Sequence, residues 1–484
     1  MRFTTAAVWA SIAVSLVSAI DTIEIKGRHF YNSKSGKPFF IKGVDYQPGG
    51  SAAVEKGSDP LSDPEKCARD IFLFQKLGIN TIRVYSVDPT LNHDECMTML
   101  AGAGIYLVLD VNTPLSNEHI YDMEPWTTYT PAYIKHVFEC IEVFSGYDNT
   151  LAFLAGNEIV HTKGSELVSP KYIKSVVRDM KAYITHQIPR SIPVGYSNAD
   201  HVEFRVSLAE YLACGEIGWV DFFAINSYQW CGDNTFEGSG YDVLVNDYKN
   251  YSLPIFFSEY GCNLVRPRLF QETAALFSDQ MTGVFSGGLI YEYSQEPADY
   301  GIVKIASNGK DCALLGEFDT LQKVHESVPN PTIPSGATEN QRPMCKDPSY
   351  YWNIAGDSEL PKSFGVDYIK KGVASSGSVK WTKGKFVSLD KVPDETTYTI
   401  KDSSGKEIKD KKIEWVADVK QVIKEGGNGK ETGGGDGTET SVGPLSDSSS
   451  NSTTSEDSKG GAFSLQVALG TISTAAMAVI LATL

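Results

Sequence analysis

The sequence predicts an α/β protein built on a (β/α)₈ barrel, the TIM-barrel fold. From Ile20 to about Asn330, short apolar runs alternate with longer segments of helical periodicity, which is typical of a parallel sheet covered by helices. Eight such runs occur within roughly 300 residues, which matches the usual size of this barrel. Polar residues recur where the runs end, as expected at the active-site edge of such a barrel.

The predicted strands are short and mostly apolar. They are Phe39–Val44, Thr81–Tyr85, Tyr106–Asp110, Leu151–Asn157, Val194–Ser197, Val220–Asn226, Ile255–Glu259 and Gly288–Tyr293. Helical stretches are expected between them, for example Pro64–Lys76, Leu91–Ala103, Pro131–Phe144 and Pro170–Gln187. Two flanking strands, near Ile23–Lys26 and Phe30–Tyr31, are expected to cap the lower end of the barrel.

The pattern changes after the barrel region, where Pro329 and Pro331 interrupt it. Residues 331–425 are predicted to hold a tethered segment with Cys345 and then a small β-rich module. Its expected β segments are FGVDYI, GSVKWTKGKFVSL, TTYTIKD and KKIEWVADV, within Ser363–Val422. Trp381 and Trp415 in this module fit core packing better than sugar stacking, because Trp is usually well buried. Residues 426–461 are rich in Gly, Ser and Thr, which predicts a disordered, O-glycosylated stalk.

Both ends of the chain resemble processing signals. Met1–Ala19 has an early Arg, an apolar run and a small-residue cleavage site, which predicts a secretory signal peptide rather than a membrane anchor, because the run is short. The tail Ala462–Leu484 is apolar and follows a polar spacer, which predicts a GPI-anchor signal with Asn451 as the anchored residue. A transmembrane helix is the alternative, but no basic flank follows the tail. The expected location is the outer face of the plasma membrane, or the cell wall.

Composition narrows the class of partner. The formal charge is −17, which argues against nucleic acid, because phosphate binding requires Lys and Arg. A neutral sugar polymer makes no such demand. The eight histidines form no metal-ligand spacing, so no metal or cofactor is expected. Secretion makes the eight cysteines disulfide candidates, but about a hundred pairings are possible and the sequence alone cannot choose among them.

Two predicted strands end in a glutamate. LAFLAGNEIV ends a buried run with Asn157 and Glu158, and PIFFSEYG places Glu259 at the end of another. A lone glutamate there would indicate a structural ion pair with Arg. Two carboxylates at the mouth of one barrel are instead what glycosidic-bond cleavage requires.

The two glutamates are expected to divide the chemistry. Glu259 would attack the anomeric carbon, and Glu158 would act first as acid and then as base. A retaining pair lies about 5–5.5 Å apart, whereas an inverting pair is wider. The nearby negative charge would raise the pKa of the acid. Asn157 would hold the sugar 2-hydroxyl, and Tyr228 would orient the nucleophile.

Four motifs carry a family resemblance. AGNEI, FFSEYG, RVYSVDP and YSNAD resemble the fungal GPI-anchored β-1,3-glucanosyltransferases of glycoside hydrolase family 72, over about Ile20–Cys345. The resemblance implies a TIM barrel and a retaining enzyme. Such an enzyme cuts an internal bond of β-1,3-glucan and joins the newly formed reducing end to the non-reducing end of another glucan chain. Some members carry a cysteine-rich carbohydrate-binding module, which this chain is expected to lack because no cysteine follows Cys345.

The resemblance also implies residue roles. Glu158 corresponds to the acid/base and Glu259 to the nucleophile. The implied substrate contacts are Tyr85 and Tyr291 for the donor sugar, Asn157, Asp200 and Arg205 for the acceptor, and Gln47, Asp110 and Tyr228 elsewhere in the cleft. For Asp200 and Arg205, a surface salt bridge is the alternative. The implied disulfides are Cys67–Cys96, Cys214–Cys345 and Cys231–Cys262, with Cys140 and Cys312 unassigned.

Three functions remain open at this point. The first is a glucan transferase that binds donor and acceptor β-1,3-glucan chains. The second is a secreted endo-β-1,3-glucanase of the same fold, and the third is an inactive glucan-binding protein of the wall. Asn250 lies in an Asn-Tyr-Ser acceptor sequence and is the predicted N-glycosylation site.

Overall fold

A computed structural model describes residues 20–328, 330–334, 343–351, 353–354, 359–373 and 383–416. Several predictions fall outside these residues: the signal peptide, Trp381, the whole stalk, the proposed anchor residue Asn451 and the apolar tail. Within the described part of the chain, no helix combines the length and the apolarity needed to cross a membrane.

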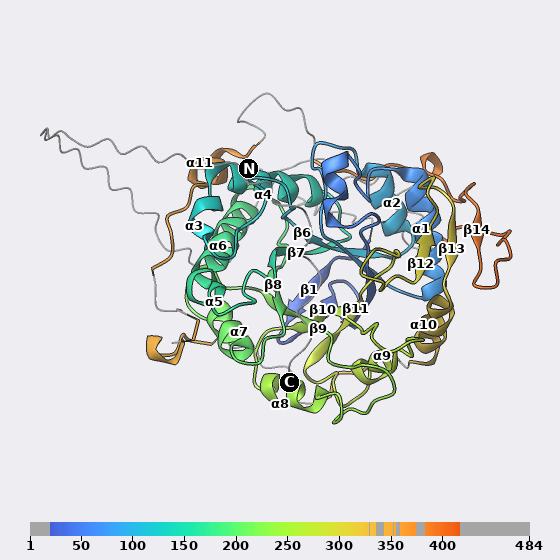
Figure 1. The fold of residues 1–484 in the computed structure, drawn as a ribbon. Helices are drawn as coiled ribbons and strands as arrows, with labels where there is room; N and C mark the ends of the chain where they lie inside the picture. The colour runs from blue at the N-terminus through green and yellow to red at the C-terminus, as the bar shows by residue number, and fades with distance from the viewer. Residues whose placement is uncertain are drawn as a thin grey trace, which may run out of the picture. The chain divides into compact units, whose positions relative to one another are not determined.

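The predicted barrel is confirmed. Eight parallel strands close on themselves in the order β10-β11-β4-β5-β6-β7-β8-β9, and helices surround them (Figure 1). The strands are β4 (Ile41–Asp45), β5 (Thr81–Val84), β6 (Tyr106–Asp110), β7 (Thr150–Asn157), β8 (Val194–Ala199), β9 (Phe222–Ser227), β10 (Ile255–Tyr260) and β11 (Phe285–Ile290).

Three of the four predicted helices begin at the predicted proline, and the fourth, α2, begins three residues after the predicted Leu91. The helices are α1 (Pro64–Leu77), α2 (Asp94–Gly102), α3 (Pro125–Thr128), α4 (Pro131–Phe144), α5 (Ser165–Val168), α6 (Pro170–Gln187), α7 (Arg205–Ala213), α8 (Tyr241–Tyr248), α9 (Gln271–Leu276), α10 (Gly316–Ser327) and α11 (Val366–Lys371). Short 3-10 helices occupy Ser51–Lys56, Pro348–Tyr351 and Leu389–Lys391. Asp63 caps α1 by accepting a hydrogen bond from the backbone N–H of Lys66, and a proline follows the cap.

The strand β11 begins three residues before the predicted Gly288–Tyr293 and ends at Ile290. Its centre approaches β4 so closely that a Cβ atom at Gly287 would lie 2.0 Å from the carbonyl oxygen of Ile41. Only glycine fits there, so the first four residues of the strand, Phe285–Gly288, include none of the branched residues that mark the other strands. The earlier end places Tyr291 in the loop beyond the barrel.

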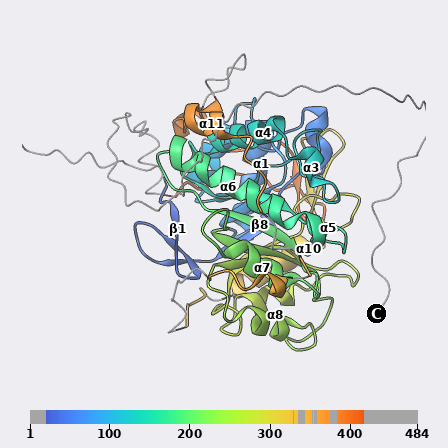
Figure 2. The same ribbon diagram turned by 90° about the vertical axis from the view of Figure 1, so that its left-hand side faces the viewer.

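A small sheet closes the lower end of the barrel, as predicted. It consists of β1 (Ile23–Lys26), β2 (His29–Asn32) and β3 (Pro38–Phe39). Phe30 packs edge-on against Phe222 and Phe256, which stand near the beginnings of β9 and β10. Figure 2 shows β1 at one end of the barrel and α3 and α5 at the other.

A small β module follows the barrel, and the barrel region contributes to it. The short strand β14 (Ile400–Lys401) pairs with β13 (Cys312–Leu314), which pairs with β12 (Val303–Ile305). A further bridge joins Glu395 to Lys412. Trp415 is partly buried against the core, in agreement with the packing interpretation.

One of the predicted β segments in this region is wrong, and a second forms no strand in its described part, residues 383–389. FGVDYI ends within the helix α11, because the spacing of its apolar residues lets Ile369 bury its side chain beside α6. Residues 383–388, within the second predicted segment, form neither helix nor strand. Their backbone is held instead by α2, since the N–H of Lys385 donates to Asp94 and that of Val387 donates to Thr98.

The three disulfides that the resemblance implied are present. They join Cys67 to Cys96, Cys214 to Cys345 and Cys231 to Cys262. The second ties the segment after the barrel to the end of α7. The remaining two cysteines, Cys140 and Cys312, are buried free thiols.

Candidate active site

The predicted polar residues gather at the carboxyl ends of the barrel strands. Glu158 directly follows β7, and Glu259 lies one residue before the end of β10. Between them, Asn226 pairs with Glu259 in the register of β9 and β10. Because parallel strands end at one edge of a barrel, these side chains face the same region of space.

The carboxylate of Glu259 is held by three donors. Its Oε1 atom accepts hydrogen bonds from the Tyr85 hydroxyl (2.8 Å) and from a guanidinium nitrogen of Arg83 (3.0 Å). Its Oε2 atom accepts a hydrogen bond from the Tyr228 hydroxyl at 2.5 Å. Both oxygens are therefore fixed in direction, which suits a group that must be aimed at a carbon atom.

Glu158 has the environment of a proton donor. Burial raises its pKa, and the nearby charge of Glu259 raises it further. A hydrogen bond of 2.8 Å from the side-chain amide of Asn226 to Oε1, together with the charge of Arg83, partly offsets this. The sequence predicted this effect of the charge of Glu259 on the pKa of Glu158.

The backbone at Glu158 is strained. Its φ of 48° lies in the left-handed region, which costs a residue with a side chain roughly 1 kcal/mol or more. The conformation is held on both sides, because the N–H of Glu158 donates to the carbonyl of Ser197 (2.9 Å) and its carbonyl accepts from Nδ1 of His161 (2.7 Å). The strained turn directs the side chain at the end of β7.

A buried arginine connects the predicted cleft residue Asp110 to Glu259. Arg83 is fully buried, contacts both carboxylate oxygens of Asp110 at 2.8 and 3.2 Å, and stacks over the ring of Tyr85. Burial raises the pKa of Asp110, and Arg83 opposes that effect. Asp110 thus fixes the guanidinium of Arg83, which in turn donates a hydrogen bond to Glu259.

Hydroxyl and amide groups form a network beneath the glutamates. The Oδ1 atom of Asn157 accepts hydrogen bonds from Ser197 (2.7 Å) and Asn226 (3.1 Å). Ser258 donates to Oδ1 of Asn226 at 2.8 Å. Since these contacts occupy the oxygen of Asn157, its amide NH₂ is the group left for a substrate.

Three partly exposed tyrosines pack together near Glu259. Tyr228, Tyr291 and Tyr300 lie edge to face, with ring centroids 5.1–6.0 Å apart. Tyr228 and Tyr291 were predicted. Tyr300 was not, because it follows a loop of Glu, Gln, Pro and Asp rather than a strand end.

The other predicted substrate contacts are placed differently. The side chain of Gln47 is occupied by the loop after β5, since its Oε1 atom accepts from the backbone N–H groups of Tyr85 and Ser86 at 3.0 Å each. It therefore positions Tyr85. Asp200 and Arg205 pair with each other at 2.9 Å, and Arg205 also contacts Asp247. Arg205 is only 4% exposed, so this pair is not an ordinary surface salt bridge.

Besides Tyr300, sequence reasoning assigned no role to three residues of the site, although it placed one of them, Asn226, at the polar end of a predicted strand. Arg83 and Asn226 each bind one of the glutamates, and Asp45 ends β4 directly beside Arg83 in the strand register. Burial raises the pKa of Asp45 well above its usual value, and its carboxyl oxygens have no hydrogen-bond partner among the described residues. The available signal was a charged residue inside an apolar strand, which by itself does not reveal its partner.

No group of three or more His, Cys, Asp or Glu side chains in the described ranges is arranged to hold a metal ion.

Comparison with known proteins identifies relatives along most of the chain. Residues 12–329 match the family model described as Glucanosyltransferase, of glycoside hydrolase family 72. The chain is 50% identical over 401 residues to the 1,3-beta-glucanosyltransferase GAS4 of Saccharomyces cerevisiae, covering 81% of this chain and 83% of that protein. It is 45% identical over 376 residues to the 1,3-beta-glucanosyltransferase gel2 of Aspergillus fumigatus, covering 76% and 79%.

A solved structure agrees with the fold. Gas2p of Saccharomyces cerevisiae, in complex with laminaritriose and laminaritetraose, is 36% identical, with a TM-score of 0.64 over 71% of this chain and 77% of that one. The chain with this barrel, this glutamate pair and these three disulfides therefore belongs to the glucanosyltransferases of glycoside hydrolase family 72.

Proposed function

We propose that this protein is a 1,3-β-glucanosyltransferase that remodels β-1,3-glucan by a retaining double displacement. The observation that carries the proposal is the coupled pair Glu158 and Glu259, with the acid form of one favoured beside the fixed carboxylate of the other. The names of its relatives and the laminari-oligosaccharides bound to the yeast structure support the same substrate class.

In the first step, an oxygen of Glu259 attacks the anomeric carbon of an internal glucose. The bond from that carbon to the leaving glucan breaks, and Glu158 gives its proton to the departing oxygen. The products are a glycosyl ester on Glu259 and a released reducing-end fragment.

In the second step, Glu158 removes the proton from a hydroxyl at the non-reducing end of another glucan. That oxygen attacks the anomeric carbon, the ester to Glu259 breaks, and a new β-1,3 bond forms. Glu158 is protonated again and Glu259 is restored, so neither residue is consumed.

The surrounding residues serve this cycle in two ways. Tyr85 and Tyr291 contact the donor sugar, and the amide of Asn157 donates to the sugar 2-hydroxyl, an interaction that strengthens in the transition state. Gln47, Asp110 and Tyr228 position these groups, through Tyr85, Arg83 and Glu259 respectively.

Transfer rather than hydrolysis requires that a held acceptor outcompete water. Positioning of a reactant can be worth an effective concentration of 10⁵ M or more, on the order of the advantage needed. Asp200 and Arg205 are our candidates for this role. Their ion pair is rigid, and the carboxylate of Asp200 can still accept hydrogen bonds from sugar hydroxyls.

Product sizing tests the proposal. The purified protein is incubated with a reduced laminari-oligosaccharide, and the products are separated by length. Products longer than the substrate support transfer. If all products are shorter than the substrate, the protein is instead an endo-β-1,3-glucanase. If the parent protein, Glu158→Gln and Glu259→Gln give identical product profiles, the protein is an inactive glucan-binding protein.

The termini and Asn250 suggest where the enzyme acts. We propose secretion, N-glycosylation of the exposed Asn250 and attachment by a GPI anchor at Asn451 to the outer face of the plasma membrane. Phosphatidylinositol-specific phospholipase C would then release the protein from intact cells. Retention after that treatment, together with release by detergent alone, would favour a transmembrane tail.

A further inference from the structure

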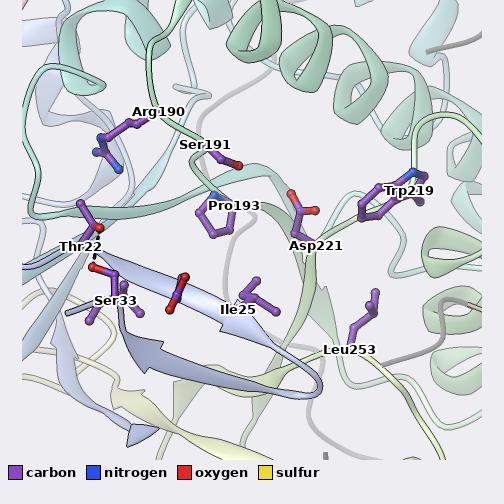
Figure 3. Close-up of a pocket in the computed structure, with 11 residues that line it drawn as sticks. Thr22, Ile25, Ser33, Arg190, Ser191, Pro193, Trp219, Asp221 and Leu253 are labelled. Carbon is purple, nitrogen blue, oxygen red and sulfur yellow. Dashed lines mark hydrogen bonds between the residues drawn. The ribbon is translucent and has the colours of Figure 1, made fainter. Parts of the chain in front are cut away.

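The lower end of the barrel holds a cavity that the proposed chemistry does not use. It measures about 480 Å³ and lies between the β1–β2 hairpin and the loops that enter the barrel strands. Its lining includes Thr22, Glu24, Ser33, Arg190, Trp219 and Asp221. Figure 3 shows Arg190, Thr22 and Ser33 on one side, and Asp221, Trp219 and Leu253 on the other.

The strand directions separate this cavity from the active site. Pro193, Asp221 and Leu253 come just before β8, β9 and β10, whereas Glu259 lies near the end of β10. At about 3.3 Å per residue, the six residues from Leu253 to Glu259 span roughly 20 Å. A ligand in this cavity would therefore touch neither catalytic glutamate.

The lining excludes most classes of ligand. The charged side chains of the lining already have partners, since Glu24 contacts Lys26 at 2.6 Å, Asp221 contacts Lys181 at 2.8 Å, and Arg190 donates to the carbonyls of Tyr147 and Thr150. These paired groups offer little attraction to an ionic ligand of either sign. The hydroxyls of Thr22 and Ser33, which hydrogen-bond to each other at 2.9 Å, disfavour a purely apolar molecule. What remains is a neutral molecule with many hydroxyl groups, because each hydroxyl can both donate to a carboxylate and accept from a guanidinium.

The aromatic and acidic groups on one wall are held rigidly. Lys181 donates to Oδ1 of Asp221 at 2.8 Å, and the backbone N–H of Val194 donates to Oδ2 at 2.9 Å. The ammonium group of Lys181 also lies 2.9 Å from the centroid of the Trp219 ring, and Trp219 remains partly exposed. A fixed indole beside a fixed carboxylate can stack on a sugar ring and bind its hydroxyls with little loss of side-chain entropy.

We propose that this cavity is a second, non-catalytic binding site for a neutral oligosaccharide, and that its ligand is β-1,3-glucan. The sugar class rests on the cavity itself, whereas the choice of β-1,3-glucan rests on the proposed function. Such a site would keep a long glucan on the enzyme while one of its ends, or another chain, occupies the cleft.

Binding stoichiometry tests the site directly. Laminarihexaose is titrated by calorimetry into the full chain carrying Glu158→Gln, so that no turnover occurs. We expect one binding event beyond those at the donor and acceptor positions of the cleft, and Trp219→Ala should weaken that event alone by about tenfold or more. Identical titration curves for the parent and for Trp219→Ala would overturn the proposal.

A second substitution keeps the test valid if Trp219→Ala fails to fold. Ser191 is an exposed residue at the cavity, so Ser191→Arg should block it without disturbing the core. The matched control is Ser404→Arg, at an exposed serine in the β module. We expect the second site to be lost in the first variant and retained in the second. Its retention in Ser191→Arg would contradict the assignment.

Activity and competing sugars separate this site from the proposed function. With active protein, Trp219→Ala should leave the rate on laminarihexaose unchanged but reduce the rate on long β-1,3-glucan at low substrate concentration. Binding at the second site would persist even if product sizing showed no transfer. Filling of that site by chitohexaose or a mannose hexamer, but not by laminarihexaose, would overturn the choice of β-1,3-glucan.

Discussion

The side-chain amide of Asn226 donates a hydrogen bond of 2.8 Å to Oε1 of Glu158. The donor stabilises the charged form of the carboxyl, against the burial that raises its pKa. Asn226 therefore opposes burial and the charge of Glu259 in setting how readily Glu158, the proposed general acid, keeps its proton.

Replacing this donor should move the pH profile. In Asn226→Ala, the pKa of Glu158 should rise further, because the charged form loses its hydrogen bond. Glu158 must be protonated for the first step, so the alkaline limb of kcat/KM should shift to higher pH, and kcat should fall. A pH–rate profile on laminarihexaose measures this. An alkaline limb that stays in place or moves to lower pH would contradict the assignment of Glu158 as the acid.

Tyr228→Phe should slow the chemistry more than it weakens binding. The hydroxyl donates to Oε2 of Glu259, and a hydrogen bond to a charged group is worth about 1.5–3 kcal/mol. We expect a fall in kcat of about 10- to 100-fold with a smaller change in KM.

The matched control is Tyr106→Phe. Its hydroxyl donates to the carbonyl of Asp21 at the other end of the barrel, so kcat should be unchanged. Equal losses of kcat in Tyr228→Phe and Tyr106→Phe would indicate a general loss of fold rather than a role at the nucleophile.

Arg83→Met should destabilise the fold in a pH-dependent way. The substitution leaves the buried carboxyls of Asp110 and Glu259 without their cation, at a cost of about 3–5 kcal/mol near pH 7. The pKa of Asp110, already raised by burial, should rise further above its unfolded value. A folded-state pKa above the unfolded one contributes stability that is present at low pH and lost as pH rises.

Urea unfolding at pH 4 and pH 7 measures the effect, and the loss should be larger at pH 7. The control is Arg28→Met, because the guanidinium of Arg28 donates to the backbone carbonyls of Tyr248 and Lys249, and its loss should depend little on pH. A loss in Arg83→Met that is the same at both pH values would refute the account of the buried ion pairs.

The loss of stability on removing a disulfide should increase with the length of the loop that the disulfide closes. The Cys214–Cys345 bond spans 131 residues, and the Cys67–Cys96 bond spans 29. Chain entropy predicts losses of about 5 and about 3.5 kcal/mol when each pair is replaced by serine. Denaturant unfolding of the two double variants gives the comparison. A larger loss for the shorter loop would mean that native contacts, rather than chain entropy, dominate.

The sequence by itself determined the barrel and its two catalytic candidates. Two apolar runs end at Asn157–Glu158 and at Glu259. These runs indicate both the strands and the edge at which they end, because a parallel strand that is buried on both faces must be apolar until it reaches solvent. Pro64, Pro131 and Pro170 mark the starts of their helices for an equally local reason.

Only the tertiary structure decided which side chains meet. Arg83, Asp45 and Asn226 join the site through strand pairing and barrel closure, and neither relationship is encoded in the residues next to them. The helix α11 and the extended chain at Lys385 and Val387 depend likewise on groups of α2, α4 and α6 that the local sequence does not contain. The physical reason is that buried polar groups and short apolar segments take the partners that packing brings to them, whereas long periodic segments largely specify themselves.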